Sequence, residues 1–356
     1  MHRLVVAGAG MAGLVSAARA RELGASVVVH EKGDRQGGSM LLSSGVVWRY
    51  RDWEYFRSEC PRGDPKLQRL VWERLDDALA WLESLGAPVV ARETGNPVTV
   101  GLRFDPRGLT EALARRAGEI RLEEPLLELP EGVPVVLATG GFQGSRALVR
   151  EFVTPEADSL VLRANPWSEG DGLRIGLSRG AQLSEGLDEI YGRALPAPPA
   201  RVTPDGFVEL SQLYARFATV TNARGERYEA RTWSEIDVVQ WIARQPGARA
   251  WYLVPEGALA ERVGARSVGE MIAAAQAAGA AVERRGRALE VEVIAGITST
   301  LGGLGVDERA RAAEGLFACG ADAGGISTGG YSSGLAAALV LGLVAAEEAV
   351  ASRSTP

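Results

Sequence analysis

The segment Gly8–Gly13 (GAGMAG) is a complete Gly-x-Gly-x-x-Gly pattern. In this pattern the first glycine allows a tight turn, the second lets the backbone approach a pyrophosphate, and the third lets a helix pack on a strand. The amino end of that helix then offers N–H donors and a positive dipole to the phosphates. Glu31 follows 21 residues after Gly10, where a carboxylate can accept hydrogen bonds from ribose hydroxyls. Together these residues predict a dinucleotide site.

The residues around this loop must form a βαβ unit to support that chemistry. Residues 3–8 contain the run Leu4-Val5-Val6-Ala7 and predict a buried strand, and Met11–Leu23 carries apolar residues at helical spacing. Gly24 follows as a C-cap, and Ser26–His30 predicts a second apolar strand that ends at Glu31. The structural alternative is a glycine-rich turn without a ligand, which explains neither Glu31 nor the later glycine clusters.

Two clusters after Glu31 favour FAD over NAD. An NAD domain would continue with further βαβ repeats, whereas Gly37-Gly38-Ser39 and Ser43-Ser44-Gly45 follow almost at once. Such a loop suits an extended cofactor that continues past its pyrophosphate toward an isoalloxazine ring. Because no histidine lies in this loop, we expect the FAD to be bound non-covalently.

Composition excludes several other classes of protein. The chain has 356 residues, a net charge of −6 and no polybasic block, so nucleic acid is not an expected partner. Two cysteines and two histidines provide no disulfide framework and no metal or c-type haem motif, and they suit a reducing compartment. The chain starts without a secretory pattern, and the apolar run at residues 335–346 is too short to span a bilayer. We therefore expect a cytoplasmic protein with no membrane span.

The pattern along the chain indicates two domains. Strong helical patterns occur in residues 66–85 and 108–118, whereas residues 188–230 gain proline, arginine and aromatic residues. The glycine-rich style returns after Ile294. The predicted fold class is α/β: a Rossmann-like FAD-binding domain with an inserted smaller α+β capping domain. The predicted FAD-binding domain is discontinuous, at residues 1–187 and 298–356, and the capping, substrate-binding domain is at 188–297.

Further motifs resemble a known family, the flavoproteins of fumarate reductase, succinate dehydrogenase and 3-ketosteroid dehydrogenase. Their order and approximate spacing match over most of the chain. Besides the segments above, the resemblance rests on these motifs: Ala138-Thr139-Gly140-Gly141-Phe142, Gly170-Asp171-Gly172, Gly225-Glu226-Arg227-Tyr228, Thr300-Leu301-Gly302-Gly303-Leu304 and Gly315-Leu316-Phe317-Ala318-Cys319-Gly320. The family implies an FAD domain interrupted by a mobile cap, with the substrate between cap and flavin.

The resemblance also implies a set of FAD contacts. Asp171 matches the acid of the family's Gly-Asp-Gly turn, with a helix N-cap as the structural alternative. Ala321 stands where the family has Glu or Asn, so Asp322 is expected to reach the ribityl chain instead. Gly334 begins the last helix, whose amino end would face the flavin pyrimidine. The implied contacts are Gly8, Ala9, Gly10, Met11, Ala12, Glu31, Lys32, Gly37, Gly38, Ser39, Ser43, Ser44, Gly45, Ala138, Thr139, Gly140, Asp171, Asp322, Gly334 and Leu335.

The dicarboxylate-binding residues of fumarate reductases are missing. The family's histidine before Thr-x-Gly-Gly corresponds to Ser299, and the arginine of the last glycine-rich loop corresponds to Tyr331. The arginine acid falls near Glu235, and the first histidine of the cap falls near Gly192, beside Tyr191. Without these cations the desolvation of two carboxylates would not be offset. Fumarate and succinate are therefore not the expected substrates.

Tyr331 and Gly334 resemble the ketosteroid dehydrogenase loop, in which a tyrosine hydroxyl and a glycine N–H hold a ketone oxygen. Ser332-Ser333 replaces the usual Pro-Gly-Pro and is one residue shorter. The resemblance implies that an oxyanion hole stabilises an enolate, a base takes the α-proton, and hydride passes to flavin N5. Glu235 is the first candidate base, with a solvated helix charge as its alternative. Tyr191 and Tyr214 are further candidates, each with a packed aromatic ring as its alternative.

The expected function is an FAD-dependent oxidoreductase that acts on a CH–CH bond beside a carbonyl, on a small-molecule substrate. One alternative is reduction of a small unsaturated carboxylic acid with Arg227 or Arg231 as the anion partner. Another is a flavin-binding electron-transfer subunit that needs a partner. Because haem and iron–sulfur motifs are missing, we expect an external electron donor or acceptor.

Overall fold

The chain divides into two compact units. The computed structural model describes residues 3–230 and 235–352. The first unit contains Met1–Ser145, Asn165–Glu189 and Ser299–Pro356, and the second contains Arg146–Ala164 and Ile190–Thr298. This division differs from the predicted domain bounds mainly at residues 146–164, which the sequence placed with the FAD-binding part. The reason is that β8 (Val161–Leu162) pairs in parallel with β15 (Ala288–Thr300) of the second unit.

The first unit is built on a six-stranded sheet. Its order is β16 (Arg311–Ala313), β17 (Leu316–Ala318), β7 (Val135–Leu137), β1 (Arg3–Ala7), β2 (Ser26–His30) and β6 (Glu119–Arg121). All neighbours are parallel except the β16–β17 pair. Strand β1 pairs with β2 on one side and with β7 on the other, so the order in which the chain adds parallel strands reverses at β1. Such a switch point is where open α/β sheets bind ligands, at the carboxyl ends of the strands.

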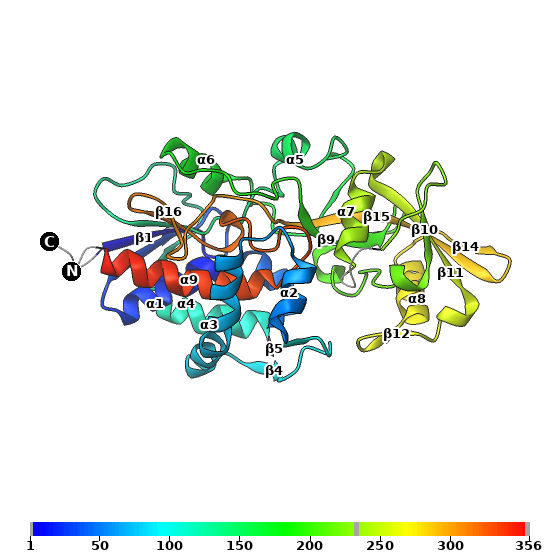
Figure 1. Cartoon of the computed structure of the whole chain (residues 1–356), viewed down its shortest axis with the longest axis horizontal. Helices are drawn as coiled ribbons and strands as arrows, with labels where there is room; N and C mark the ends of the chain where they lie inside the picture. The colour runs from blue at the N-terminus through cyan, green and yellow to red at the C-terminus, as the bar shows by residue number, and fades with distance from the viewer. Residues whose placement is uncertain (1–2, 231–234, 353–356) are drawn as a thin grey trace. The chain divides into compact units, whose positions relative to one another are not determined.

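Two helices of the first unit pack against α1 (Met11–Glu22). Figure 1 shows α1 beside α4 (Pro106–Ala117) and the last helix, α9 (Gly334–Ala351), which also contacts α3 (Pro65–Ser84). Ser16 Oγ donates to the Gly342 carbonyl at 2.9 Å and so joins α1 to α9. Among the described residues, α9 is the one helix long and apolar enough to cross a membrane, and 67% of it is buried within the protein. It therefore extends beyond the apolar run at 335–346 and serves as a core helix.

A small antiparallel sheet in the first unit was not predicted. Its order is β3 (Val46–Tyr50), β5 (Thr99–Phe104) and β4 (Val89–Ala91), and α2 (Trp53–Glu59) follows β3 directly. The loop before β3 contains a 3₁₀ turn at Gly38–Leu42. A Cβ on Gly45 would overlap the Phe104 carbonyl, so this glycine lets the loop approach β5.

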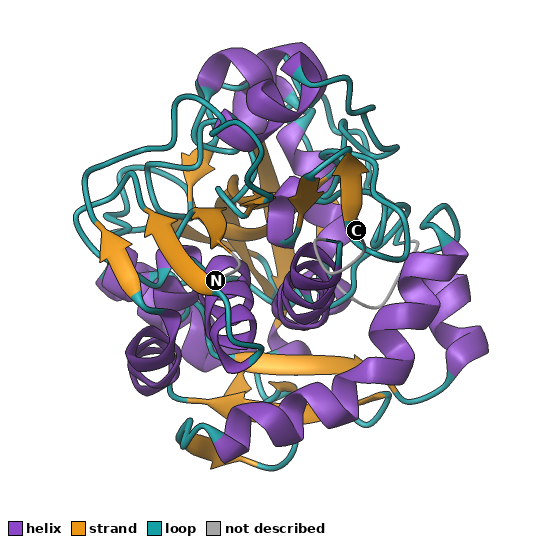
Figure 2. Cartoon of the chain, turned by 90° about the vertical axis from the view of Figure 1, so that its left-hand side faces the viewer, coloured by secondary structure: helices purple, strands orange, loops and turns teal. Residues whose placement is uncertain are grey.

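The second unit is an α+β body around β15, which pairs with β11 (Arg249–Pro255), β14 (Val282–Arg285), β8 and β9 (Ile190–Pro196). Strand β10 (Thr219–Thr221) extends this sheet beyond β11, and β12 (Arg262–Val263) and β13 (Arg266–Ser267) form a separate hairpin. Its helices are α5 (Arg146–Phe152), α7 (Ile236–Ala243) and α8 (Val268–Ala277). Ser267 and Glu270 form a capping box at the start of α8. Figure 2 looks onto the first unit, whose strands (orange) lie among its helices (purple).

Candidate active site

The three glycines of the first loop have different surroundings. A Cβ on Gly8 would overlap the Ala138 carbonyl, and a Cβ on Gly13 would overlap the Gly8 carbonyl. These two glycines are therefore required by packing, and Gly8 also has φ +103°. No described atom lies within 4 Å of the place where a Cβ on Gly10 would stand. Gly10 is also the N-cap of α1 without a side-chain cap, so the first N–H groups of this helix are available to a phosphate.

Glu31 holds the glycine loop to the end of β2. Its Oε2 accepts the Ala9 N–H at 2.7 Å, and its Oε1 accepts the Gly33 N–H at 2.6 Å. The side chain is 8% exposed. A carboxylate has about four acceptor positions, so two backbone bonds leave capacity for ribose hydroxyls. Glu31 thus has both a structural role and the position that a ribose-binding acid requires.

The loop after Glu31 is fixed against the first glycine loop. The Gly37 N–H donates to the Ala9 carbonyl at 2.8 Å, and Gly10 and Gly37 form an isolated parallel bridge. Ser39 Oγ accepts from the backbone N–H and the side-chain amide of Asn165. The Ser43 hydroxyl donates a hydrogen bond to the Met40 carbonyl within the same turn. Ser44 is exposed.

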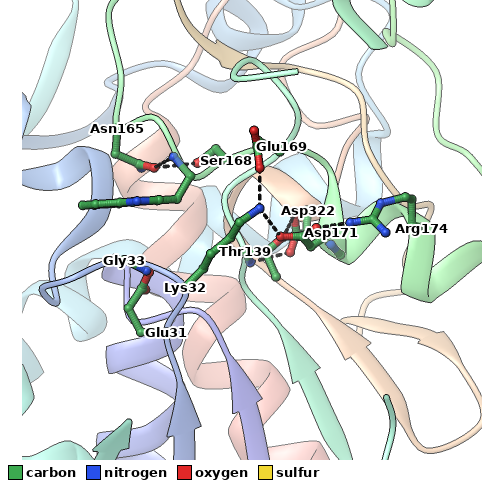
Figure 3. A network of polar contacts seen from close by, with 12 residues as sticks. Glu31, Lys32, Gly33, Thr139, Asn165, Ser168, Glu169, Asp171, Arg174 and Asp322 are labelled. Atoms are coloured by element: carbon green, nitrogen blue, oxygen red, sulfur yellow. Dashed lines mark hydrogen bonds and ion pairs between the residues drawn. The ribbon is translucent and has the colours of Figure 1, made fainter. Parts of the chain in front are cut away.

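A charged network lies beside these loops (Figure 3). Lys32 Nζ pairs with Asp171 at 3.1 Å and also with Glu169, and Arg174 pairs with Asp171. The carboxylates raise the pKa of Lys32, although its partial burial, the largest single cause, opposes them. Asp171 is the first residue of α6 (Asp171–Ser178), and the N-cap is Gly170. The N-cap alternative for Asp171 was therefore wrong by one residue, although an acid in the first turn still complements the helix dipole.

Asp322 connects two loops at the carboxyl edge of the sheet. Its Oδ2 accepts the Thr139 N–H at 2.5 Å, while its Oδ1 accepts the Thr139 hydroxyl and the Gly141 N–H at 3.0 Å each. The residue is 2% exposed. Burial raises the pKa of Asp322 and the three hydrogen bonds lower it. Its oxygens thus fix the Thr139–Gly141 turn, and contact with a ribityl chain stays a prediction.

These observations fit a bound dinucleotide. The loops after β1, β7 and β17 converge, since a Cβ on Gly320 would lie 3.0 Å from Ala12 Cβ, and Gly8 faces the Ala138 carbonyl. Gly10 leaves open space in front of the amino end of α1. The cradle therefore offers backbone donors for a pyrophosphate and Glu31 for a ribose.

A second group of polar atoms surrounds the start of α9. Tyr331 Oη lies 3.5 Å from the Gly334 nitrogen, whose N–H points to it. Gly334 is exposed, and no described atom lies within 4 Å of the place where its Cβ would stand. Ser333 caps α9 by accepting the Ala336 N–H at 3.2 Å. The Tyr331 hydroxyl and the first N–H of α9 therefore lie side by side at an open surface of the first unit.

Comparison with known proteins identifies the family. The sequence model of the FAD binding domain family matches residues 3–124 and 132–335. The chain belongs to this FAD binding domain family. The resemblance noted in the sequence is thereby confirmed, as is the fold class of a Rossmann-like FAD domain with a smaller capping domain.

Individual relatives are more distant. The chain is 22% identical over 302 residues to the probable fumarate reductase of Shewanella frigidimarina, covering 70% of this chain and 50% of that protein. The open form of a flavocytochrome c3 fumarate reductase superimposes with a TM-score of 0.71 at 20% identity, covering 98% of this chain and 78% of that one. The 3-ketosteroid-Δ4-(5α)-dehydrogenase of Rhodococcus jostii also gives 0.71, at 16% identity, covering 98% and 97%. These likenesses establish the fold, and the chain spans half the length of the curated relative.

The candidate bases for removal of the α-proton lie in the second unit. Glu235 is the N-cap of α7 with φ 59°, and its oxygens accept the N–H groups of Ala215 and Arg216 at 3.0 and 3.2 Å. It is partly buried, and this burial raises the pKa of Glu235 against those hydrogen bonds. This environment differs from that of a fully solvated helix charge, and the role of Glu235 as a base stays a prediction. Tyr191 is partly buried, with the Arg193 guanidinium 5.1 Å from its ring centroid.

Tyr214 has the surroundings of a packed aromatic residue. It is 0% exposed, its ring lies edge-on to Tyr252 with centroids 5.6 Å apart, and its hydroxyl donates to Gln212 Oε1 at 2.7 Å. A phenol closed in on all sides does not reach a substrate, so this environment favours the structural alternative. Of the two candidate anion partners, Arg227 is exposed and Arg231 lies outside the described residues.

Sequence reasoning missed the residues that support Tyr331. Tyr50, at the end of β3, donates its hydroxyl to the Tyr331 carbonyl at 2.7 Å. Trp48, on the same strand, lies with its ring centroid 6.0 Å from that of Tyr331. The aromatic run in Val46–Tyr50 was the available signal, but nothing local indicated pairing with a loop more than 270 residues away.

Proposed function

We propose that this chain is an FAD-dependent oxidoreductase that dehydrogenates or reduces a C–C bond adjacent to a carbonyl. Its chemistry is ketosteroid-dehydrogenase-like rather than fumarate-specific. The observation that carries this proposal is the 3.5 Å separation of Tyr331 Oη and Gly334 N at the exposed start of α9. An O–H donor and an N–H donor at one point can bind a single carbonyl oxygen.

The two donors would stabilise charge as it develops on that oxygen. Tyr331 would donate a hydrogen bond from its hydroxyl and Gly334 one from its N–H, and the amino end of α9 would add its positive dipole. Negative charge on the oxygen lowers the pKa of the neighbouring C–H, so a base can remove the α-proton. When FAD is bound, it supplies the acceptor or donor of hydride for the β-carbon.

The cofactor would lie along the cradle already described. Gly10 and the first turn of α1 face the pyrophosphate, and Glu31 faces a ribose. We propose that this attachment is non-covalent. Denaturing the yellow protein in acid should release all flavin into the supernatant, whereas flavin that remains with the precipitate would show a covalent bond.

The second unit is proposed as the capping, substrate-binding domain. Within it, Glu235 and Tyr191 are the candidates for the proton-transferring group. The raised pKa of Glu235 suits a base, although its two backbone hydrogen bonds restrict the orientation of the carboxylate. Tyr191 lies beside a cation, with the Arg193 guanidinium 5.1 Å from its ring centroid.

The substrate is proposed to be neutral or mono-anionic. Ser299 and Tyr331 stand where a fumarate site would need cationic side chains. Two carboxylates without such partners would be desolvated at a cost of several kcal/mol, on the order of that for other buried ions. Electrons would come from, or go to, an external partner such as a quinone, oxygen or another protein.

An anaerobic stopped-flow screen tests the proposal. Oxidised enzyme is mixed with saturated cyclic ketones, and reduced enzyme with cyclic enones, small enoates and fumarate, while the flavin band is followed. Tyr331→Phe should lower turnover roughly 100-fold or more with normal flavin content, as expected for loss of an oxyanion donor. A response to enoates alone would favour the unsaturated-acid alternative, and no response would favour an electron-transfer subunit. Unchanged turnover in Tyr331→Phe would remove the role given to this hydroxyl.

A further inference from the structure

We propose that Tyr50 and Cys60 are positioning residues that hold the backbone of Tyr331 on its carbonyl side and its N–H side and so keep the Tyr331 hydroxyl beside the Gly334 N–H. This inference rests on the proposed carbonyl-binding role of that pair. It assigns a function to the β3–α2 segment, which lies far from Tyr331 in sequence and which no motif indicated.

Tyr50 fixes the backbone carbonyl of Tyr331. Its hydroxyl donates to the Tyr331 oxygen at 2.7 Å, and the residue is 0% exposed. Its ring stacks on Phe56 with centroids 5.2 Å apart and meets Tyr55 edge-on at 5.6 Å. Burial raises the pKa of Tyr50 far above its usual range, so the phenol stays protonated and remains a donor. A donor on a side chain packed on all sides is a rigid support.

Cys60 lies on the N–H side of Tyr331. The residue is fully buried; this burial raises the pKa of its thiol, and the nearby backbone N–H of Tyr331 opposes that shift. The two segments are in close contact here, since a Cβ on Gly330 would overlap the Glu59 carbonyl and would lie 3.4 Å from Cys60 Sγ. The carbonyl and the N–H of Tyr331 therefore both face side chains of one short segment, residues 50–60.

The same segment also supports the Tyr331 ring. The Trp48 ring lies 6.0 Å from Tyr331 and 5.2 Å from Tyr50, edge-on in both cases. On the other side of Tyr331 the chain is fixed by Ser332, whose hydroxyl lies 2.6 Å from that of Ser327, and by the Ser333 cap of α9. Only two residues separate Tyr331 from Gly334. The orientation of the Tyr331 backbone therefore determines where the Tyr331 hydroxyl lies relative to the first N–H of α9.

The consequence is a dependence of anion binding on Tyr50. If its hydroxyl is removed, the Tyr331 carbonyl loses its buried donor and the loop must relax to satisfy it. A displacement of about 1 Å of a positioned group can reduce catalysis on the order of 100-fold. The loss should fall on ligands whose oxygen carries negative charge, because these depend most on both donors.

The test uses p-nitrophenol as a probe of the carbonyl site in the FAD-loaded protein. Its affinity is measured by the absorbance of the bound probe at pH values below and above its own pKa, which gives separate dissociation constants for phenol and phenolate. Tyr50→Phe should weaken phenolate binding about tenfold and phenol binding less than twofold, since one displaced donor accounts for about that factor. A purely structural defect would weaken both forms equally. The control is Tyr55→Phe, which removes a hydroxyl bonded to Glu59 in the same aromatic cluster and should change neither constant.

A second pair of variants tests the contribution of Cys60 independently of Tyr50. Cys60→Ser keeps an acceptor for the Tyr331 N–H and should retain phenolate affinity, whereas Cys60→Ala should lose it. If Tyr331→Phe weakens phenolate binding but Tyr50→Phe and Cys60→Ala do not, the positioning role of Tyr50 and Cys60 is overturned and the proposed function stands. If Tyr331→Phe has no effect, or the wild-type protein binds neither form, the carbonyl-binding role itself is overturned.

Discussion

The Asp322 carboxylate accepts two hydrogen bonds from Thr139, at 2.5 Å from the backbone N–H and at 3.0 Å from the hydroxyl. A third bond, from the Gly141 N–H, completes the set. These contacts join the loop after β17 to the loop after β7, two neighbouring strands of the sheet. The carboxylate therefore shapes the edge of the sheet where the FAD cradle lies, even without touching the cofactor.

Asp322→Asn should destabilise this junction. An amide of the same shape turns one acceptor oxygen into an NH₂ donor that faces an N–H group, and it leaves a buried donor without a partner. We expect a loss of about 1–3 kcal/mol in the free energy of unfolding, measured by urea titration, together with weaker FAD binding. Asp307→Asn is the matched control, because Asp307 also accepts two backbone N–H groups but is exposed. Equal effects of the two substitutions would contradict a special role for Asp322.

Gly10 and Gly13, two of the three glycines of the first loop, should separate cofactor binding from folding. A Cβ on Gly10 meets no described atom, so Gly10→Ala should fold with a stability within about 0.5 kcal/mol of wild type. It should nevertheless weaken FAD binding at least tenfold, because the methyl group occupies the space in front of the helix that a pyrophosphate needs. Titration of the apoprotein with FAD, followed by flavin fluorescence, measures this loss.

Gly13→Ala should behave in the opposite way. Its Cβ would overlap the Gly8 carbonyl, so α1 must move away from β1. We expect a loss of stability of roughly 3 kcal/mol or more, in the range of severe core substitutions, seen as a lower melting temperature of the apoprotein. A stable Gly13→Ala variant, or a Gly10→Ala variant with normal FAD affinity, would show that the roles assigned to these glycines are wrong.

The sequence was informative where structure depends on nearby residues. The βαβ unit follows from the glycine spacing and the apolar periodicity within about thirty residues, and α1 and β2 lie where predicted. The β3–β5–β4 sheet was missed because Val46–Tyr50 pairs with Thr99–Phe104, about fifty residues later. The placement of residues 146–164 was missed for the same reason, since Val161 pairs with Gly296.

The same limit applies to the candidate site. Tyr331 and Gly334 were found because they are three residues apart in a recognisable loop. Tyr50 is 281 residues from Tyr331, and a buried tyrosine in a strand is ordinary in sequence terms. Single hydrogen bonds between distant segments leave no periodic trace in the sequence, and only the packed structure reveals them.

The raised pKa of Glu235 predicts a specific dependence of stability on pH. In the unfolded chain this carboxyl ionises near pH 4.3, about the value for a free glutamate, while the folded state holds the proton to higher pH because of burial. The unfolded state then binds fewer protons, so stability falls as the pH rises through the raised pKa. Relative to Glu235→Gln, wild type should therefore lose stability from about pH 4 upward.

Urea unfolding at a series of pH values measures this difference. Glu283→Gln is the control, because Glu283 is exposed on β14 of the same unit. A wild-type stability that instead rises with pH relative to Glu235→Gln would show that the N–H groups of Ala215 and Arg216 outweigh burial. In that case Glu235 would be an ionised loop-capping residue and a poor base.

The N–H of Gly334 can be removed without breaking α9. Gly334 is the first helical residue, where proline is tolerated because the N–H has no acceptor within the helix. Ser333 has φ −61° and ψ 111°, which suits a residue before proline. Gly334→Pro should keep normal flavin content but lower kcat/KM by about 100-fold, the effect of removing one oxyanion donor. Gly334→Ala keeps the N–H and places its Cβ in open space, so its kcat/KM should stay within about threefold of wild type.

Because Tyr331 and Gly334 would act on one oxygen, adding Tyr331→Phe to Gly334→Pro should lower kcat/KM by less than the product of the two single effects. Equal activity of the alanine and proline variants would show that this N–H does not bind the carbonyl, and a fully multiplicative double variant would show that the two groups act separately.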